Sequence, residues 1–281
     1  MTWLLVLTVL VIVWLYLICP RLDRGNTLRM QGQNVLYVAH RGLHDAQIPE
    51  NSLAAFRKAV DAGYAIELDV RLTKDKALAV LHDETTERMC GTKCVVSDKT
   101  MAELSCCRLS DSPYTIPSLN QVLEVVRGRV PLIIEMKSTG TNPETARVLL
   151  EALRGYRGQY AVESFNPFLL WYVKKHAPQI TRGQLTGARA KERRDISYCL
   201  LCLIDRLLFV NALSRPDFIA YDEQDVGKTL FTLERKLFHP ICAVWTIRNA
   251  DQANKASTQC DMMIFEGFDP RNDLKGVNDH G

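Results

Sequence analysis

The sequence lacks a strong excess of charge of either sign. Its 281 residues include 35 Lys and Arg against 32 Asp and Glu, so the formal net charge is only +3. A surplus this small does not by itself indicate a nucleic-acid-binding protein. We therefore expect no nucleic acid among the partners, and the overall composition is that of an ordinary globular protein.

The pattern of cysteines also lacks what a zinc site needs. The total of nine cysteines is odd, and neither Cys90/Cys94 nor Cys199/Cys202 is accompanied by a second pair of ligands at suitable spacing. We therefore expect reduced thiols in a reducing compartment.

Residues 3–19 contain no charged side chain and form an almost unbroken apolar run that ends at Pro20. No lysine or arginine precedes this run, and Ile18-Cys19-Pro20 is a poor cleavage site, so we favour an anchor over a cleaved signal peptide. The run is near the lower limit for spanning a bilayer. We expect a transmembrane anchor over residues 1–20.

Basic residues follow the expected anchor closely, at Arg21, Arg24 and Arg29. Because positively charged residues flank membrane segments on the cytoplasmic side, we expect a single-pass membrane protein whose main domain lies in the cytoplasm. Residues 21–34 would form a linker to that domain, which spans residues 35–281.

The ionisable residues that indicate chemistry gather between residues 35 and 83. The apolar run 35–39 predicts a short buried strand with His40 and Arg41 at its carboxyl end, and residues 53–62 have the apolar spacing of a helix. The next predicted strand contains Glu67 and Asp69, which lie two apart and therefore on one face. A strand-helix-strand unit with polar strand ends is typical of parallel α/β proteins.

A polar turn over residues 73–76 and an extended run over residues 77–81 predict a hairpin after this strand. The hairpin would return His82 to about the level of Asp69 and so to the same mouth as His40. Carboxylates on one strand face suit a hard cation such as Ca2+ or Mg2+. Histidines suit proton transfer near neutral pH, and the planar fork of Arg41 suits a phosphate.

The remaining chain continues the alternation of strands and helices. Leaving out the return strand of the hairpin, we count eight strands, which predicts a (β/α)8 TIM barrel with its site at the carboxyl ends of the strands. Residues 84–117 lack clear periodicity and are expected to form a long, loop-rich excursion, which is more often functional than not. The eight predicted strands are residues 35–39, 64–70, 130–135, 160–164, 180–185, 217–221, 241–245 and 261–265.

Five short blocks, in this order and spacing, resemble the glycerophosphodiester phosphodiesterase family. The resemblance extends roughly from residue 35 to the end and is strongest in the first half. It implies a TIM barrel of the phospholipase-C-like phosphodiesterase type. In this family a small insertion lies over the barrel mouth and helps to select substrate, and residues 84–117 would form it. The blocks are His40-Arg41-Gly42, Pro49-Glu50-Asn51-Ser52, Glu67-Leu68-Asp69-Val70, His82-Asp83 and Glu135-Met136-Lys137.

The resemblance implies roles for individual residues. Glu67, Asp69 and Glu135 would be the metal ligands, and His40 and His82 the general acid and base, with their order left open. Arg41 and Lys137 would bind the phosphate, and Glu50 would support the site. Trp245, at the end of a predicted strand, would line the substrate pocket or be a buried structural residue.

The function implied by the resemblance is metal-dependent hydrolysis of glycerophosphodiesters to sn-glycerol 3-phosphate and an alcohol. The nucleophile is either water or the substrate's own glycerol hydroxyl. One alternative is lysophospholipase D activity on membrane lipids, which an apolar channel in residues 84–117 would favour. A second alternative is a non-catalytic, membrane-anchored binding module, although all five blocks keep their ionisable residues.

Some residues receive no catalytic role. The other histidines lie away from strand ends with carboxylates, and Glu266 stands near the last strand where the family usually has a Thr-Asp pair. Residues 189–208 combine a basic start with an apolar run. We interpret them as a barrel helix, or alternatively as an element that lies on an anionic membrane surface.

Overall fold

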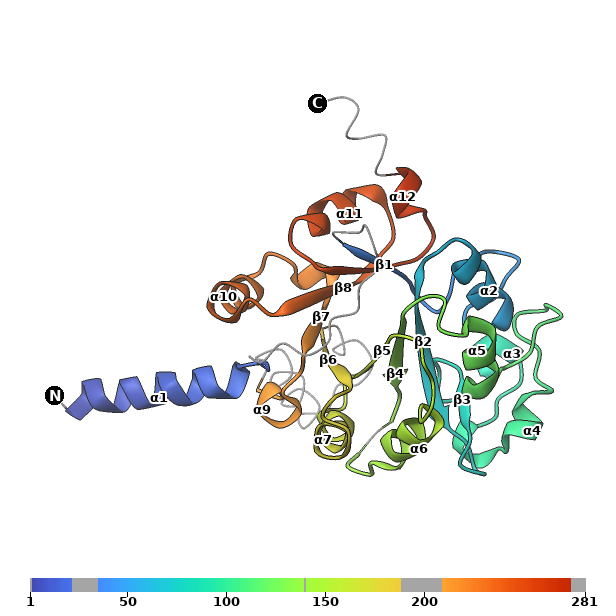
Figure 1. The fold of residues 1–281 in the computed structure, drawn as a ribbon, viewed down its shortest axis with the longest axis horizontal. Helices are drawn as coiled ribbons and strands as arrows, with labels where there is room; N and C mark the ends of the chain where they lie inside the picture. Colours follow the sequence, from blue (N-terminus) through green and yellow to red (C-terminus); the bar gives the residue numbers. More distant parts are fainter. Residues whose placement is uncertain (1, 22–34, 139, 188–208, 274–281) are drawn as a thin grey trace.

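The computed structural model describes residues 2–21, 35–138, 140–187 and 209–273. Within them, the strands form one sheet in the order β1-β9-β8-β7-β6-β5-β4-β2-β3, and β1 also pairs with β2. This last pairing closes a barrel of eight parallel strands, while β3 lies outside it and antiparallel to β2 (Figure 1). The strands are β1 Leu36–Ala39, β2 Ala65–Leu72, β3 Leu78–Val80, β4 Leu132–Met136, β5 Tyr160–Ser164, β6 Thr181–Thr186, β7 Phe218–Asp222, β8 Ile241–Ile247 and β9 Met262–Phe265.

Helices surround the barrel and connect successive strands, so the predicted (β/α)8 fold is confirmed. Polar caps fix where several helices begin. The Ser52 hydroxyl accepts from the Ala55 amide at the start of α2, and Ser118 and Gln121 cap α5 reciprocally. The helices are α1 Thr2–Ile18, α2 Leu53–Asp61, α3 Glu87–Cys90, α4 Met101–Leu104, α5 Leu119–Val126, α6 Glu144–Ala152, α7 Pro167–His176, α9 Asn211–Ser214, α10 Thr229–Phe238, α11 Ala250–Ser257 and α12 Pro270–Asp273, with 3-10 turns η1 Val96–Asp98 and η3 Glu223–Asp225.

The strands are buried on both faces because apolar side chains fill the barrel interior and also pack under the helices. Residues on the interior side include Val38, Ile133 and Phe218. Two-sided burial explains why the strands have continuous apolar sequences rather than strict alternation. The hairpin expected after β2 is also present, with Val70 opposite Val80, which brings His82 within one residue of the predicted level.

The insertion over residues 84–117 contains α3, η1 and α4 and packs around a small apolar cluster that includes Ala79 and Leu81 of the β3 segment. Its helical segments have only three or four residues. Segments this short cannot display a helical period, which explains why the sequence predicted only an irregular excursion.

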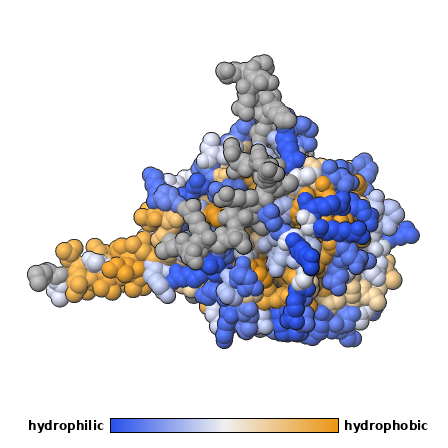
Figure 2. Space-filling view, in the orientation of Figure 1, coloured by the Kyte–Doolittle hydropathy of each residue, from blue (hydrophilic) through white to orange (hydrophobic). Residues whose placement is uncertain are grey.

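Helix α1 is apolar and projects from the barrel with most of its surface exposed, as Figure 2 shows. It has 17 residues. In the part of the chain that the structure describes, no helix combines the length and apolarity needed to cross a bilayer, so the expected transmembrane anchor is not supported. The expected linker, from residue 22 on, and the alternative surface element at residues 189–208 lie outside the described residues.

The carboxyl end of α1 is joined to the barrel near the start of β7. Ile18 is fully buried, and its carbonyl accepts a 2.7 Å hydrogen bond from the Asn211 amide. The Arg215 guanidinium donates to the Cys19 carbonyl at 2.6 Å and lies over the Tyr16 ring. These contacts fix α1 at the amino-terminal end of the strands, away from the ends where the polar residues gather.

A buried carboxyl group lies directly beneath this junction. Glu234 of α10 is fully buried, and its two oxygens accept hydrogen bonds from Asn211 at 3.2 Å and Tyr221 at 2.6 Å. Burial raises the pKa of Glu234 to about 8, although the hydrogen bond from Tyr221 opposes this shift.

We expect the stability of the protein to depend on pH through Glu234. Because its folded pKa is raised above the ordinary 4.5, the folded state gains from the protonated form, and this gain is lost as pH rises from about 4.5 to 8. Glu234→Gln removes the titration. Its melting temperature should exceed that of the wild type by about 10 °C at pH 9 and match it near pH 4, measured by calorimetry. Exposed Glu124→Gln is the control. A difference in melting temperature between Glu234→Gln and the wild type that stays the same at all pH values would contradict the expectation.

Candidate active site

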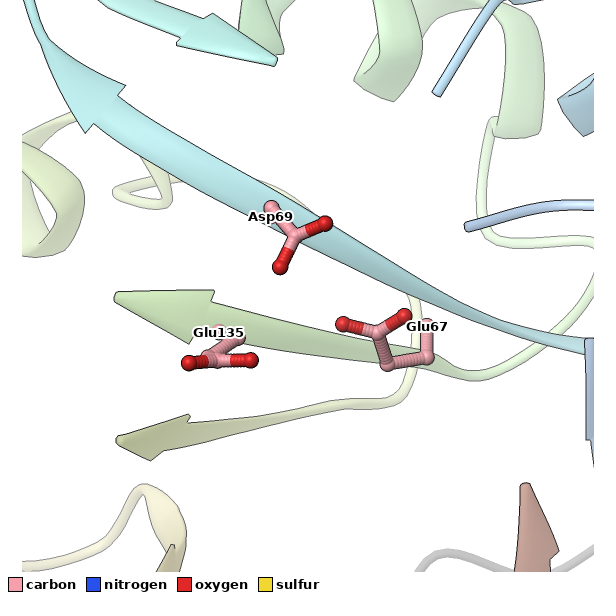
Figure 3. A group of neighbouring side chains, drawn as sticks. All are labelled: Glu67, Asp69 and Glu135. Carbon is pink, nitrogen blue, oxygen red and sulfur yellow. The ribbon is translucent and has the colours of Figure 1, made fainter. Parts of the chain in front are cut away.

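Three carboxylates converge inside the carboxyl end of the barrel. Glu67 and Asp69 come from β2, and Glu135 comes from the neighbouring β4, where it pairs with Asp69. Each offers an oxygen that lies within 4.8 Å of the others, and all three side chains are buried. Figure 3 shows the carboxylates of the two strands directed toward the same space.

Two basic side chains and an amide partly compensate this charge. Lys137 Nζ lies 2.7 Å from Glu135 Oε2 and 3.1 Å from Asp69 Oδ1. On the other side of Asp69, Arg41 Nε lies 3.3 Å from Oδ2, which also accepts a 2.8 Å hydrogen bond from the Asn51 amide. Asp69 is therefore surrounded by donors, whereas Glu67 accepts from the backbone amide of Arg41 at 3.0 Å.

The three carboxyl groups have different charged and hydrogen-bonding partners, and their pKa values are therefore shifted in different directions. Burial would raise the pKa of Asp69, but Lys137 and Arg41 hold it well below its usual range. Burial raises the pKa of Glu67 well above its ordinary value, and the charges of Asp69 and its neighbours add to this shift. Burial also raises the pKa of Glu135 in spite of Lys137. The cluster thus contains more carboxyl groups than its own basic residues can keep ionised.

This donor set fits a hard divalent cation. Ca2+ and Mg2+ prefer carboxylate oxygens, and among the described residues only Glu67, Asp69 and Glu135 form a group with ligand atoms close enough for a metal ion. The raised pKa of Glu67 gives the same indication, because a bound cation would stabilise the ionised form of Glu67.

His40 follows β1 and is held by a residue from the far end of the chain. Its Nδ1 lies 2.5 Å from Glu266 Oε2, directly after β9, while its Nε2 lies 3.9 Å from Glu67 Oε2. Arg248 donates to the other oxygen of Glu266 at 2.7 Å. Burial lowers the pKa of His40, and the hydrogen bond to Glu266 opposes this effect.

His82 follows β3 and is held by the next residue in the chain. Its Nδ1 lies 2.8 Å from Asp83 Oδ1, and the Arg88 guanidinium donates to the other oxygen of Asp83 at 2.5 Å. Arg88 also donates to Glu50 at 2.6 Å, and Glu50 accepts from Arg41 at 2.8 Å. Glu50 therefore connects the Arg41 side of the site to the His82 side.

The predicted site residues thus lie at one end of the barrel, but several of their partners were not predicted from the sequence. Glu266 was given no role, and Asn51 appeared only within one of the five blocks. Glu266 follows the last strand just as His40 follows the first, and β1 pairs with β9. The equivalent positions of Glu266 and His40 after the last and first strands could have indicated the contact. However, 226 residues separate them in the sequence.

Two further residues define the interior of the site. Glu163 of β5 pairs with Glu135 and is 1 % exposed, and one of its carboxyl oxygens has no hydrogen-bond partner among the described residues. Burial and the charge of Glu135 raise its pKa well above the ordinary value. Trp245 of β8 donates its indole N–H to the Ala220 carbonyl at 3.1 Å and packs edge-on against Phe165. Its ring belongs to the border between the barrel core and the mouth.

A scan against family models matches residues 40–266 to the glycerophosphoryl diester phosphodiesterase family. The chain belongs to this family. The match begins at His40 and ends at Glu266, the two residues whose side chains are hydrogen-bonded across the closure of the barrel.

Individual relatives agree with the family assignment. A glycerophosphodiester phosphodiesterase of Caldanaerobacter subterraneus is 37% identical over 53% of this chain and 66% of its own length. A human lysophospholipase D is 32% identical over 36% of each chain. The matched part of the chain thus spans less than two thirds of these relatives.

Among solved structures, a phosphodiesterase of Oleispira antarctica in complex with sn-glycerol-3-phosphate superposes with a TM-score of 0.69. It is 22% identical and covers 87% of this chain and 96% of its own. At this identity the likeness establishes the fold.

We expect Glu266 to sustain the basicity of His40. Because the hydrogen bond from the imidazole to Glu266 raises the pKa of His40 against the effect of burial, Glu266→Gln should lower that pKa further. The imidazole can be titrated by NMR. The matched control is Arg248→Gln, which keeps the Glu266 carboxylate and should not lower the pKa of His40. An unchanged or raised His40 pKa in Glu266→Gln would show that the pair has no such effect.

Proposed function

We propose that the protein hydrolyses glycerophosphodiesters to sn-glycerol 3-phosphate and an alcohol, and that Glu67, Asp69 and Glu135 hold Ca2+ or Mg2+ for this reaction. The observation that carries the proposal is the joint arrangement of two histidines, each bound to its own carboxylate, beside a three-carboxylate cluster and two basic side chains. Membership of the family supports the same reaction.

The hydrogen bonds of the histidines define which ring nitrogen is left for chemistry. The Glu266 and Asp83 carboxylates have pKa values below their usual range and can only accept hydrogen bonds. Nδ1 of His40 and of His82 therefore carries the proton, and Nε2 of each ring remains for proton exchange. In the proposed reaction, one histidine takes the proton of the nucleophile and the other protonates the leaving alkoxide.

Arg41 and Lys137 are the proposed phosphate-binding residues. Their side chains are mostly buried, and nearby carboxylates keep both groups positively charged, against the effect of burial on their pKa values. Both therefore offer charge-assisted donors at the mouth without having to be ordered by the substrate. When bound, a divalent cation would act as a Lewis acid that stabilises charge on the non-bridging phosphate oxygens.

The activity can be tested with the full chain and glycerophosphocholine. Release of sn-glycerol 3-phosphate should require Ca2+ or Mg2+ and stop with EDTA. His40→Ala and His82→Ala should each lower kcat/KM at least about 100-fold, while His176→Ala, an exposed residue of α7, should leave it unchanged. Turnover that persists in EDTA would contradict the metal dependence, and full activity in His82→Ala would contradict the role of that histidine.

A lysophospholipid is the second candidate substrate because the human relative bears the name lysophospholipase D. The same assay with lysophosphatidylcholine distinguishes the two, since the lipid would give lysophosphatidate and choline. Turnover of the lipid alone would replace our substrate assignment. If neither substrate is cleaved while Ca2+ still binds, a non-catalytic binding module becomes the better account.

We further propose that α1 associates with a lipid bilayer and that the barrel lies on the cytoplasmic side. The apolar side chains of α1 are largely exposed, including Leu7 and Val11 at 58% and 45%, and arginines that suit an anionic leaflet follow at positions 21, 24 and 29. Digestion of the barrel by protease added to intact cells would contradict the cytoplasmic placement.

Membrane association predicts that the protein floats with phosphatidylglycerol-containing liposomes in a density gradient. Leu7→Lys combined with Val11→Lys should abolish flotation, because burying either charge in lipid is unfavourable. The control is Leu237→Lys, which changes an exposed apolar residue of α10 and should float normally. Equal flotation of the α1 variant and the wild type would refute the role of α1.

A further inference from the structure

Arg71 is a charged residue of the barrel mouth that no step of the proposed reaction uses. It lies on β2 two residues after Asp69, so its side chain is on the same face of the strand as those of Glu67 and Asp69. Its guanidinium donates two hydrogen bonds to the backbone carbonyl of His82, from Nε at 2.8 Å and from Nη2 at 2.6 Å. Arg71 therefore contacts one of the two histidines of the site through its main chain.

The backbone of His82 lies beyond the paired part of the sheet. The pairing of β2 with β3 ends where Val70 lies opposite Val80, and His82 follows two residues later in a bend. Among the residues that the structure describes, no backbone amide donates to the His82 carbonyl. The two bonds from Arg71 thus take the place of the ladder hydrogen bond that a strand residue would have here.

The other histidine of the site is held by such a ladder bond. The backbone amide of His40 donates to the Phe265 carbonyl at 2.9 Å, so the pairing of β1 with β9 fixes the main chain of this residue. At His82 a side chain of the neighbouring strand β2 supplies the restraint instead. The main chains of both histidines are therefore restrained, one by backbone pairing and one by Arg71.

The peptide group that Arg71 binds joins His82 to Asp83. These two residues are also hydrogen-bonded through their side chains, between Nδ1 and Oδ1 at 2.8 Å. The orientation of this peptide group sets the relative positions of both side chains, so the direction of the imidazole depends on it. Arg88 restrains the Asp83 carboxylate, while Arg71 restrains the backbone from which both side chains extend.

We propose that Arg71 is a positioning residue for His82, because its hydrogen bonds to the His82 carbonyl hold the imidazole Nε2 in place for proton exchange. This inference rests on the proposed function, in which Nε2 exchanges that proton. Proton transfer requires donor and acceptor to lie within hydrogen-bond distance, and a displacement of about 1 Å can cost about 100-fold in rate. A freely moving His82 backbone would therefore lower kcat rather than weaken substrate binding.

Neutralisation of the carboxylate cluster is the competing role for Arg71. The guanidinium follows Asp69 on the same strand face, and the charges of the two groups act on each other. However, Arg41 and Lys137 form the close ion pairs with Asp69, at 3.3 Å and 3.1 Å. Both hydrogen bonds of Arg71 go to a neutral carbonyl instead, which favours positioning over charge compensation.

Two neutral variants separate the hydrogen bond from the charge. The amide nitrogen of a glutamine side chain is as many bonds from the backbone as Nε of arginine, so Arg71→Gln keeps one donor at that position. Arg71→Met has a methyl group there and no donor. We expect Arg71→Met to lower kcat for glycerophosphocholine about 10- to 100-fold with KM unchanged. Arg71→Gln, which loses only one of the two hydrogen bonds, should lower kcat only a few-fold.

The same changes in a His82→Ala background show whether the effect passes through His82. Once the imidazole is removed there is nothing to position, so Arg71→Met should cost no further activity in this background. Equal losses in Arg71→Met and Arg71→Gln would show that the charge matters and would overturn the proposal. A raised KM at unchanged kcat, or an additive loss in the double variant, would also overturn it.

A spectroscopic measurement keeps the test independent of turnover. The Nδ1 proton of His82 should give an imidazole NMR signal that is absent in His82→Ala. We expect this signal in the wild type and in Arg71→Gln, and its loss in Arg71→Met, with all variants measured below their melting temperatures. No turnover by a wild type that shows the signal would contradict the proposed function alone. An unaltered signal in Arg71→Met would overturn the positioning role.

Discussion

The arrangement of the site depends on the cost of burying three carboxylates within 4.8 Å of one another. Like charges at this separation raise each other's pKa values unless donors or cations stand beside them. Lys137, Arg41 and Asn51 stabilise the Asp69 charge, and Glu67 is left with a raised pKa. The neighbouring Glu163 meets the same constraint, and its pKa is raised by burial and by the charge of Glu135, although Lys137 opposes the shift.

The two histidines are oriented by the same kind of hydrogen bond, but their carboxylate partners lie at very different distances along the sequence. Each presents Nδ1 to a carboxylate, and an arginine holds the second oxygen of that carboxylate. For His82 the partner is adjacent in sequence. For His40 the partner is Glu266, which reaches it only because the last strand lies beside the first. Orientation of His40 therefore depends on closure of the whole barrel.

Features that depend on residues close in sequence could be predicted, whereas contacts between residues far apart in sequence could not. Local patterns predicted β5 Tyr160–Ser164 to the residue, and the hairpin after β2 placed His82 to within one residue because its turn is local. The contact of His40 with Glu266 arises from packing between distant segments. Apolar periodicity carries no information about such contacts. The apolar run near residue 10 predicted an anchor, but composition could not specify how the helix ends or where it joins the barrel.

The attachment of α1 has a geometric consequence for how substrate arrives. Asn211 and Arg215 join the helix at the end of the barrel where the parallel strands begin, whereas His40, Asp69 and Glu135 lie where the strands end. Contacts made through α1 are therefore passed to the barrel at the end opposite to the mouth. A substrate can reach the mouth without passing the junction of the helix.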